Sequence, residues 1–313
     1  MTSIALFGAT GAIGQSLAAT LDRQGRPYRV VGRSEASLHQ TFGSSPLAEI
    51  ATWNPDNPQS IQAAARGVDT LVYMVGVNYW QFGLHPELMQ KTLDGAIAAG
   101  VRRIVLIGTV YPYGHARTSP VKESHPREPH TFKGRMRKAQ EDLVLQAHAR
   151  GHIEAAVLRL PDFYGPGVRN SLLHRAFEAA AHGTKADLIG PIDRPHEFIF
   201  VPDAGPVLAR LIDTPAAFGR AWHLAGAGTI TQRGVVSEIE RQTGRALKLR
   251  VAGKPLLRLA GLFNPVMREL AEMHYLLTDP LILDDSALQD LLGPIHKTPY
   301  DQGIRASLQA AMA

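Results

Sequence analysis

The chain has 313 residues, 45% of them hydrophobic, and 33 lysines and arginines against 28 aspartates and glutamates give a formal net charge of +5. This length predicts one large or two modest domains, and the mild positive charge suits an anionic ligand without singling one out. The sequence contains no cysteine, which excludes disulfides and cysteine-based catalysis or metal sites, and no run reaches the roughly 18 apolar residues of a membrane-spanning helix.

The amino-terminal segment combines a short apolar run, a glycine-rich turn and a helical pattern. Residues 3–7 are typical of a buried strand, which leaves no room for a signal peptide and favours a cytoplasmic protein. Residues 15–22 carry apolar side chains at helical spacing, and Gly8-Ala-Thr-Gly11-Ala-Ile-Gly14 lies between the two elements. Glycines permit a tight turn and close approach to a phosphate, and a helix N-terminus supplies free N–H groups. In this context the pattern predicts a dinucleotide site.

Predicted strands and helices alternate along the following residues. We expect strands at 28–32, 69–75, 103–108, 154–159 and 198–201, and helices at 86–99 and 135–150. This alternation predicts an α/β fold with a doubly wound parallel sheet, a Rossmann fold, whose ligands bind at the carboxyl ends of the strands. We predict a dinucleotide-binding domain over 1–164 and a smaller, mainly substrate-binding C-terminal lobe over 165–313, with segments near 198–225 returning to the Rossmann sheet.

Five motifs occur in the order of one known family. Gly8–Gly14 resembles its cofactor turn, Gly108–Gly114 its segment with a catalytic Ser/Thr and a Tyr-Gly, and Arg159–Gly167 its nicotinamide-lining segment. Phe198–Asp203 resembles its Val-x-Asp segment, and Trp222–Gly226 the strand that follows. The chain thus resembles an extended or atypical short-chain dehydrogenase/reductase of the NAD-dependent epimerase/dehydratase kind.

The resemblance implies roles for individual residues. Cofactor contacts are expected from Gly8, Thr10, Gly11, Ile13, Gly14, Val75, Pro161 and Phe163. Thr109 is implied to polarise a substrate carbonyl, although its hydroxyl could equally cap the loop after the strand. Tyr113 is a candidate proton donor in place of the family's catalytic tyrosine, although its family counterpart usually shapes the pocket. Tyr164 is a candidate substrate contact.

The end of the second strand bears on the choice of cofactor. An acidic residue there would favour NAD, whereas this chain has Gly32-Arg33-Ser34. A guanidinium and a hydroxyl can bind a 2′-phosphate, so Arg33 and Ser34 predict NADP(H); the alternative is that Arg33 is merely a solvated residue. Trp53 and Asn54 stand where the family often has an adenine-contacting Asp. Asn54 remains a candidate contact, and Trp53 either stacks on adenine or packs.

The catalytic motif departs from the family pattern. The relatives use Tyr-x-x-x-Lys, one helical turn apart and on one face. Counting from Glu123–Pro129, which resembles the approach to this motif, places Lys133 at the Tyr position and Arg137 at the Lys position. Glu141 at the usual acidic position downstream supports the register.

Three interpretations of this replacement stay open. Lys133 could donate the proton, because Arg137 and the positive nicotinamide would disfavour a charged ammonium, and Arg137 could contact the ribose. Alternatively the proton relay is lost, and Lys133 binds an anionic substrate or the protein only senses the cofactor. The third interpretation makes both residues part of a solvated basic face with Arg135 and Lys138.

The remaining features are weaker. Asn78–Phe82 follows a strand end and is rich in aromatic residues, so Tyr79 and Trp80 are candidate substrate contacts, or else a satellite core. We expect no metal site and no nucleic-acid partner, and a homodimer through the helices at 86–99 and 135–150. The sequence favours an NADP-dependent oxidoreductase acting on a carbonyl/alcohol or sugar-like molecule. A catalytically silent NADP-binding regulator, or an epimerase or dehydratase that uses the cofactor transiently, is the alternative.

Overall fold

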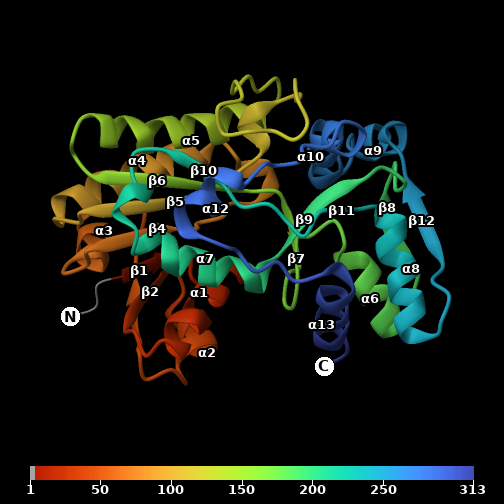
Figure 1. The fold of residues 1–313 in the computed structure, drawn as a ribbon, viewed down its shortest axis with the longest axis horizontal. Coiled ribbons are helices and arrows are strands. Elements are labelled where there is room, and N and C mark those ends of the chain that lie inside the picture. The colour runs from red at the N-terminus through yellow and green to blue at the C-terminus, as the bar shows by residue number, and fades with distance from the viewer. Residues whose placement is uncertain (1–3) are drawn as a thin grey trace.

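A seven-stranded parallel sheet forms the centre of the larger lobe in the computed structural model, which describes residues 4–313 (Figure 1). Its strands, in spatial order, are β3 (Ala48–Thr52), β2 (Tyr28–Gly32), β1 (Ile4–Phe7), β4 (Thr70–Tyr73), β5 (Arg103–Thr109), β6 (Glu154–Leu160) and β10 (Ala221–His223). The order reverses between β1 and β4, which opens a crevice at the carboxyl ends of these strands. The predicted α/β Rossmann fold is confirmed.

Helices cover both faces of this sheet (Figure 1). One face packs against α1 (Ala12–Arg23), α2 (Glu35–Phe42), α7 (Val201–Ile212) and α12 (Ser286–Leu292). The other face packs against α3 (Pro58–Ala65), α4 (Leu84–Ala98) and α5 (Phe132–Ala149). Because both faces are covered, central strands such as β1 and β4 are buried along their whole length, as continuous apolar runs predict.

The smaller lobe lies at one end of the molecule (Figure 1). Its sheets consist of β7 (Asp162–Tyr164), β9 (His196–Phe200) and β11 (Thr229–Ile230), and of β8 (Ala186–Ile189) with β12 (Leu249–Ala252). Its helices are α6 (His174–His182), α8 (Gln232–Thr243), α9 (Lys254–Ala260), α10 (Pro265–Met273), α11 (Tyr275–Thr278) and α13 (Tyr300–Met312). Three 3-10 turns complete the chain: η1 (Tyr79–Gln81), η2 (Tyr111–Tyr113) and η3 (Pro215–Ala217).

The structure revises some predicted elements. The first strand was expected from Ser3, a residue that lies outside the described part of the chain. The strand expected at 198–201 is β9, which pairs with β7 and β11 rather than with the main sheet; β10 does lie at the edge of that sheet. The domain division near residue 164 stays a prediction. Within residues 4–313, none of the helices combines the length and apolar character needed to cross a bilayer.

A separate hydrophobic cluster lies where the loops after β4 and β5 meet the last third of the chain. It joins residues of η1, η2 and α11, including Phe82, Tyr111, Tyr113 and Tyr275. This cluster is at the carboxyl ends of the strands, where ligands of doubly wound sheets bind. The candidate site is therefore built from both lobes.

Candidate functional site

The glycine-rich turn between β1 and α1 leaves no room for a larger residue at two of its glycines. Gly8 has a φ of +85°, and a Cβ there would lie 2.8 Å from the carbonyl carbon of Met74. A Cβ on Gly14 would lie 2.3 Å from the carbonyl oxygen of Ala9, so this glycine lets α1 pack directly on the turn. At Gly11 the nearest atom would be 3.4 Å away. Packing therefore requires Gly8 and Gly14 but not Gly11.

The N-terminus of α1 points into the same turn. Gly11 is its N-cap, and no side chain in the described chain caps the N–H groups of its first turn. Free N–H groups and the helix dipole favour an anion here. Thr10 is exposed and Ile13 half-buried, and Val75, at the end of the β4 segment, lies against Gly8. This arrangement fits the pyrophosphate of a dinucleotide.

Two exposed polar residues follow β2. Arg33 and Ser34 are both exposed, and the Ser34 hydroxyl accepts a hydrogen bond from the Ser37 backbone N–H at 3.3 Å as the N-cap of α2. Trp53 is only 4% exposed and meets Phe7 edge to face, with 5.4 Å between ring centroids, which favours packing over adenine stacking. Asn54 is exposed, and its side-chain oxygen accepts from the Asp56 N–H.

Thr109 and Tyr113 follow β5 but differ in access. Thr109 is half-buried, and its hydroxyl accepts a hydrogen bond from the Tyr111 N–H at 3.3 Å, so the capping alternative is realised. Tyr113 has no exposed surface, and its hydroxyl is engaged by both Arg159 and His223. A phenol enclosed in this way cannot meet a substrate, so the role of Tyr113 as a substitute acid is corrected to a packing role.

Arg159 belongs to a buried ion pair under the site. Its guanidinium donates to both carboxylate oxygens of Glu141, at 2.7 to 3.2 Å, and lies over the Tyr113 ring. Both side chains of the pair are at most 2% exposed. Glu141 on α5 thus lies opposite Arg159 on β6, and the register that places Lys133 and Arg137 in the catalytic motif stays a prediction.

Lys133 is fully buried in a cluster that the sequence did not suggest. Its ammonium donates to Glu272 at 2.6 Å and to Glu269, both on α10. The ammonium also lies 5.4 Å from the centroid of the Tyr79 ring and 5.5 Å from that of Phe82. The backbone N–H of Lys133 donates to Glu272 as well, at 3.2 Å, near the N-terminus of α5. The hydrogen bonds of Lys133 thus connect α10 to α5 of the larger lobe.

Arg137 lies one turn along α5, against the end of β5. It donates to the carbonyl oxygen of Ile107 at 2.8 Å and contacts Nδ1 of His85 at 3.4 Å. Burial, and secondly the Arg137 charge, lower the pKa of His85 to about 2, so this imidazole is neutral. The two contacts leave several of the five guanidinium N–H groups of Arg137 for other acceptors. Lys133 and Arg137 are both buried, which contradicts the solvated basic face.

Several phenols and an aspartate converge beside Lys133. The hydroxyls of Tyr79 and Tyr111 are 2.8 Å apart. Burial raises the pKa of Tyr79 to about 12 and raises that of Tyr111 well above its ordinary value, and the charge of Asp162 acts on both in the same direction. Asp162 in turn is 2.7 Å from Nε2 of His196. Tyr275, only 5% exposed, is subject to the same Asp162 charge.

The other predicted contacts are divided between surface and interior. Trp80 is 51% exposed next to Tyr79 and is accessible to a ligand. Phe163 is half-buried and Pro161 buried just beyond β6. Tyr164 is 1% exposed and packs on Phe198, Phe200 and Tyr300, so its assignment to substrate is corrected to a role in the core of the smaller lobe.

A cavity of about 680 Å³ adjoins the Lys133 cluster. Its lining includes Lys254, Arg258 and Arg268 together with Glu272 and Tyr275. His115 and His130 stack in its wall with 4.3 Å between ring centroids. Lysine and arginine side chains outnumber the acidic lining of this cavity, which favours an anionic occupant, although Arg268 also pairs with Glu269.

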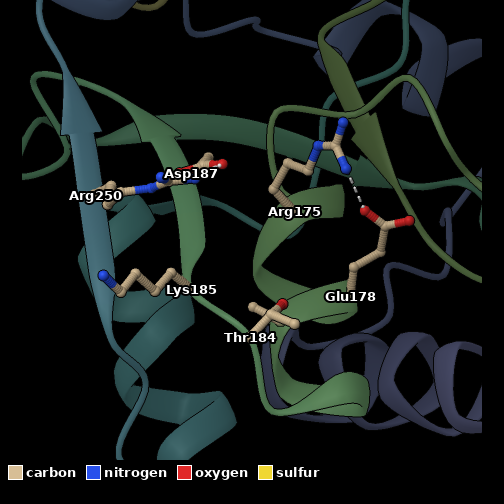
Figure 2. Close-up of a pocket in the computed structure, with 7 residues that line it drawn as sticks. Arg175, Glu178, Thr184, Lys185, Asp187 and Arg250 are labelled. Carbon is tan, nitrogen blue, oxygen red and sulfur yellow. Dashed lines mark hydrogen bonds and ion pairs between the residues drawn. The ribbon is translucent and has the colours of Figure 1, made fainter.

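A second cavity of about 340 Å³ lies within the smaller lobe. Figure 2 shows its polar lining, in which Arg175 pairs with Glu178 and Lys185 lies near Arg250. Arg250 also makes two hydrogen bonds with Asp187, at 2.5 and 2.7 Å. These residues belong to α6, β8 and β12 and not to the segments around the glycine turn. We therefore place the candidate active site at the strand ends and not here.

Sequence reasoning missed the residues that the smaller lobe contributes. Glu269 and Glu272 are about 140 positions away from Lys133, and Asp162 and His196 meet only because β7 pairs with β9. The one available signal was the Glu-x-x-Glu spacing at 269–272, which puts two carboxylates on one helix face.

Known proteins resemble this chain in sequence. The profile of the NAD dependent epimerase/dehydratase family matches residues 4–225. The chain is 30% identical over 174 residues to dTDP-6-deoxy-L-talose 4-dehydrogenase (NAD(P)(+)) of Kitasatospora kifunensis, which covers 52% of this chain and 53% of that protein. It is 30% identical over 151 residues to 2'-dehydrokanamycin reductase of Streptomyces kanamyceticus, covering 47% of this chain and 43% of that protein. The chain thus spans about half the length of these curated relatives.

Solved structures share the whole fold at low identity. UDP-glucuronic acid 4-epimerase from Bacillus cereus, in complex with NAD, superposes with a TM-score of 0.81 at 15% identity over 99% of this chain and 98% of that one. A dTDP-glucose 4,6-dehydratase from Streptomyces venezuelae gives 0.81 at 17% identity over 99% and 96%. With the profile match over residues 4–225, these findings show that the chain belongs to the NAD dependent epimerase/dehydratase family.

Proposed function

We propose that the protein is an NADP(H)-dependent oxidoreductase that acts on a carbonyl or alcohol group of an anionic, sugar-like small molecule. The observation that carries the proposal is the glycine turn at the N-terminus of α1. Two of its glycines are required by packing, whereas Gly11 leaves the N–H groups open to a phosphate. An ordinary structural turn would have no need for a glycine at this third position.

The chain's own residues suggest how the cofactor would be held. Gly11 and the first turn of α1 would bind the pyrophosphate, and Arg33 with Ser34 would bind a 2′-phosphate beyond β2. Arg137 would donate to the nicotinamide ribose from α5, beside the end of β5. When bound, the nicotinamide supplies or accepts a hydride. Thr109 would hydrogen-bond the carbonyl oxygen of the substrate.

The substrate class rests on the cavity beside α10. Lys254, Arg258 and Arg268 line it, so a phosphate or carboxylate on the substrate would find complementary charge. One relative is named for a dTDP-linked deoxysugar, which carries phosphate and fits this charge, whereas the other is named for 2'-dehydrokanamycin and does not bear on it. Exposed Trp80 would offer an apolar surface to a sugar ring.

Calorimetry with the two cofactors tests the NADP assignment. We expect NADP(H) to bind at least roughly tenfold more tightly than NAD(H), a difference of about 1.4 kcal/mol. Arg33→Asp should reverse this order, because it removes a donor and adds repulsion. Arg66→Asp is the matched control, since Arg66 is exposed just before β4, at the amino end of that strand and not at the carboxyl end where Arg33 lies, and it changes net charge equally. Equal affinities in the unmodified protein would defeat the assignment of Arg33.

A silent NADP-binding regulator is the second candidate. The full burial of Lys133 and its pairing with Glu269 and Glu272 favour it, because no phenol stands at the motif's tyrosine position. A screen of carbonyl substrates that follows oxidation of reduced nicotinamide separates the two. Tight NADP(H) binding without turnover on any of the sugar-like ketones or aldehydes would favour the regulator.

A further inference from the structure

The hydrogen-bonded pair Tyr79–Tyr111 lies beside the place that the family motif gives to its acid. We propose that Tyr79 is the proton donor of this site and that Tyr111 is its positioning residue. This proposal rests on the oxidoreductase function proposed above. It assigns the acid role to a phenol from the loop after β4 instead of the residue at position 133 on α5.

The position of the pair carries the proposal. The side chain of Lys133 ends 5.4 Å from the centroid of the Tyr79 ring, so the pair is within one side chain's width of the motif position. Tyr111 comes two residues after Thr109, and its N–H donates to the Thr109 hydroxyl. The backbone of Tyr111 therefore lies next to the group that would hold a carbonyl oxygen.

The hydrogen bond between the phenols bears on which of them can give a proton to the substrate. Each hydroxyl carries one hydrogen, so when one phenol donates to the other across 2.8 Å, one O–H group of the pair stays free. Tyr111 is 9% exposed, whereas Tyr79 is half-buried and directly precedes exposed Trp80. We therefore assign Tyr111 as the donor of this hydrogen bond, which leaves the O–H of Tyr79 for a substrate.

The surroundings hold both rings in place. Phe82 meets the Tyr79 ring edge to face at 5.3 Å and stacks on Tyr111 at 6.3 Å between centroids. Lys133 closes the other side of Tyr79 and is itself fixed by Glu269 and Glu272. A proton donor needs this kind of fixed geometry, because a misplaced donor loses most of its effect.

The electrostatics keep Tyr79 protonated until it is needed. Burial raises its pKa to about 12; the Tyr111 hydrogen bond opposes this, and the charges of Asp162, Glu272 and Glu269 add to it. A phenol that is neutral near pH 7 is the form that a carbonyl reduction consumes. A cationic oxidised nicotinamide nearby would pull the pKa of this phenol down.

Carbonyl reduction at this site needs only the substrate, a reduced nicotinamide, the Tyr79 proton and water. A bound reduced nicotinamide would supply a hydride to the carbonyl carbon, and the C=O π pair would move to oxygen. The O–H bond of Tyr79 breaks, its proton forms the alcohol O–H, and the electron pair stays on the phenolate. Tyr111 donates a hydrogen bond to that phenolate, which then recovers a proton from water.

Tyrosine-to-phenylalanine variants test the assignment by turnover. In Tyr79→Phe we expect kcat for carbonyl reduction to fall by about a hundredfold, with NADP(H) affinity within a few-fold of normal. Tyr111→Phe should lower kcat less and should move the alkaline limb of the pH profile upward, because Tyr79 loses the hydrogen bond that lowers its pKa. Tyr28→Phe is the control, since Tyr28 bonds Asp22 at the amino end of β2. Unchanged kcat in Tyr79→Phe would overturn the proposal.

A spectroscopic titration works even if no substrate is turned over. Saturating NADP⁺ should lower the pKa of one tyrosine, seen as phenolate absorbance appearing at lower pH, in the unmodified protein and in Tyr28→Phe. The shift should be lost in Tyr79→Phe. NADP⁺ that binds without shifting any phenol would overturn the donor assignment while leaving the cofactor proposal intact. Absence of NADP⁺ binding altogether would overturn both proposals.

Discussion

Replacing Lys133 by methionine tests whether this residue is an anchor or an acid. Methionine keeps an unbranched apolar side chain but removes the ammonium that is bonded to Glu269 and Glu272. A hydrogen bond to a charged group contributes about 1.5–3 kcal/mol. The two carboxylates are 15% and 24% exposed, so water compensates for part of the loss. We expect Lys133→Met to lower the free energy of unfolding by about 3 kcal/mol, or the Tm by roughly 6 °C.

Calorimetry and urea unfolding measure this effect, and two further variants calibrate it. Lys138→Met removes a partly exposed pair with Asp142 on the same helix and should cost less than about 0.5 kcal/mol. Combining Lys133→Met with Glu269→Gln and Glu272→Gln should recover at least half of the loss, because uncompensated carboxylates are the main penalty. If Lys133→Met kept full stability and NADP binding while turnover fell by about a hundredfold, the anchor interpretation would be refuted in favour of the donor.

Three further predictions follow from other contacts. Gly11→Ala should leave Tm unchanged and weaken NADP(H) binding in calorimetry. Gly14→Ala should lower Tm, because its Cβ meets the Ala9 carbonyl. Equal Tm losses in the two variants would contradict this prediction. Burial raises the pKa of Glu197 to about 7, so its contribution to stability is lost as pH rises from about 4.5 through 7. Glu197→Gln should thus gain Tm relative to the unmodified protein at pH 8 but not at pH 4.5; a constant difference would argue against a titrating Glu197. The proposed homodimer through α4 and α5 should give twice the monomer mass in light scattering at micromolar concentration.

The sequence predicted local features of the fold and site well. The apolar run, glycine turn and helix at the amino terminus have the expected order, and the alternation of strands and helices gave the correct fold class. β3 escaped prediction because it is an edge strand with exposed residues and no continuous apolar run. Glu141, on which the motif register was based, pairs with Arg159 in the interior, and the register itself stays a prediction.

The roles of individual site residues depended on contacts that sequence spacing does not encode. Tyr113 looked like an available phenol, but Arg159 and His223 enclose it from β6 and β10. Lys133 was a candidate proton donor, anion-binding residue or solvated lysine, but its partners are carboxylates of α10. In both cases residues distant in the chain decide exposure and pairing, and these are the properties that separate a reacting group from a structural one.

The cluster around Lys133 also bears on whether this site has decayed. A lysine placed in the interior without partners would cost several kcal/mol, because an unpaired buried charge is poorly solvated. Here Glu269 and Glu272 provide that pairing from α10, and the lysine ammonium packs against Tyr79. Position 133 is therefore paired by carboxylates of a second element, and the same contacts hold the neighbouring phenol in place. A buried charge left without partners is what a neglected position would show, and this position does not show it.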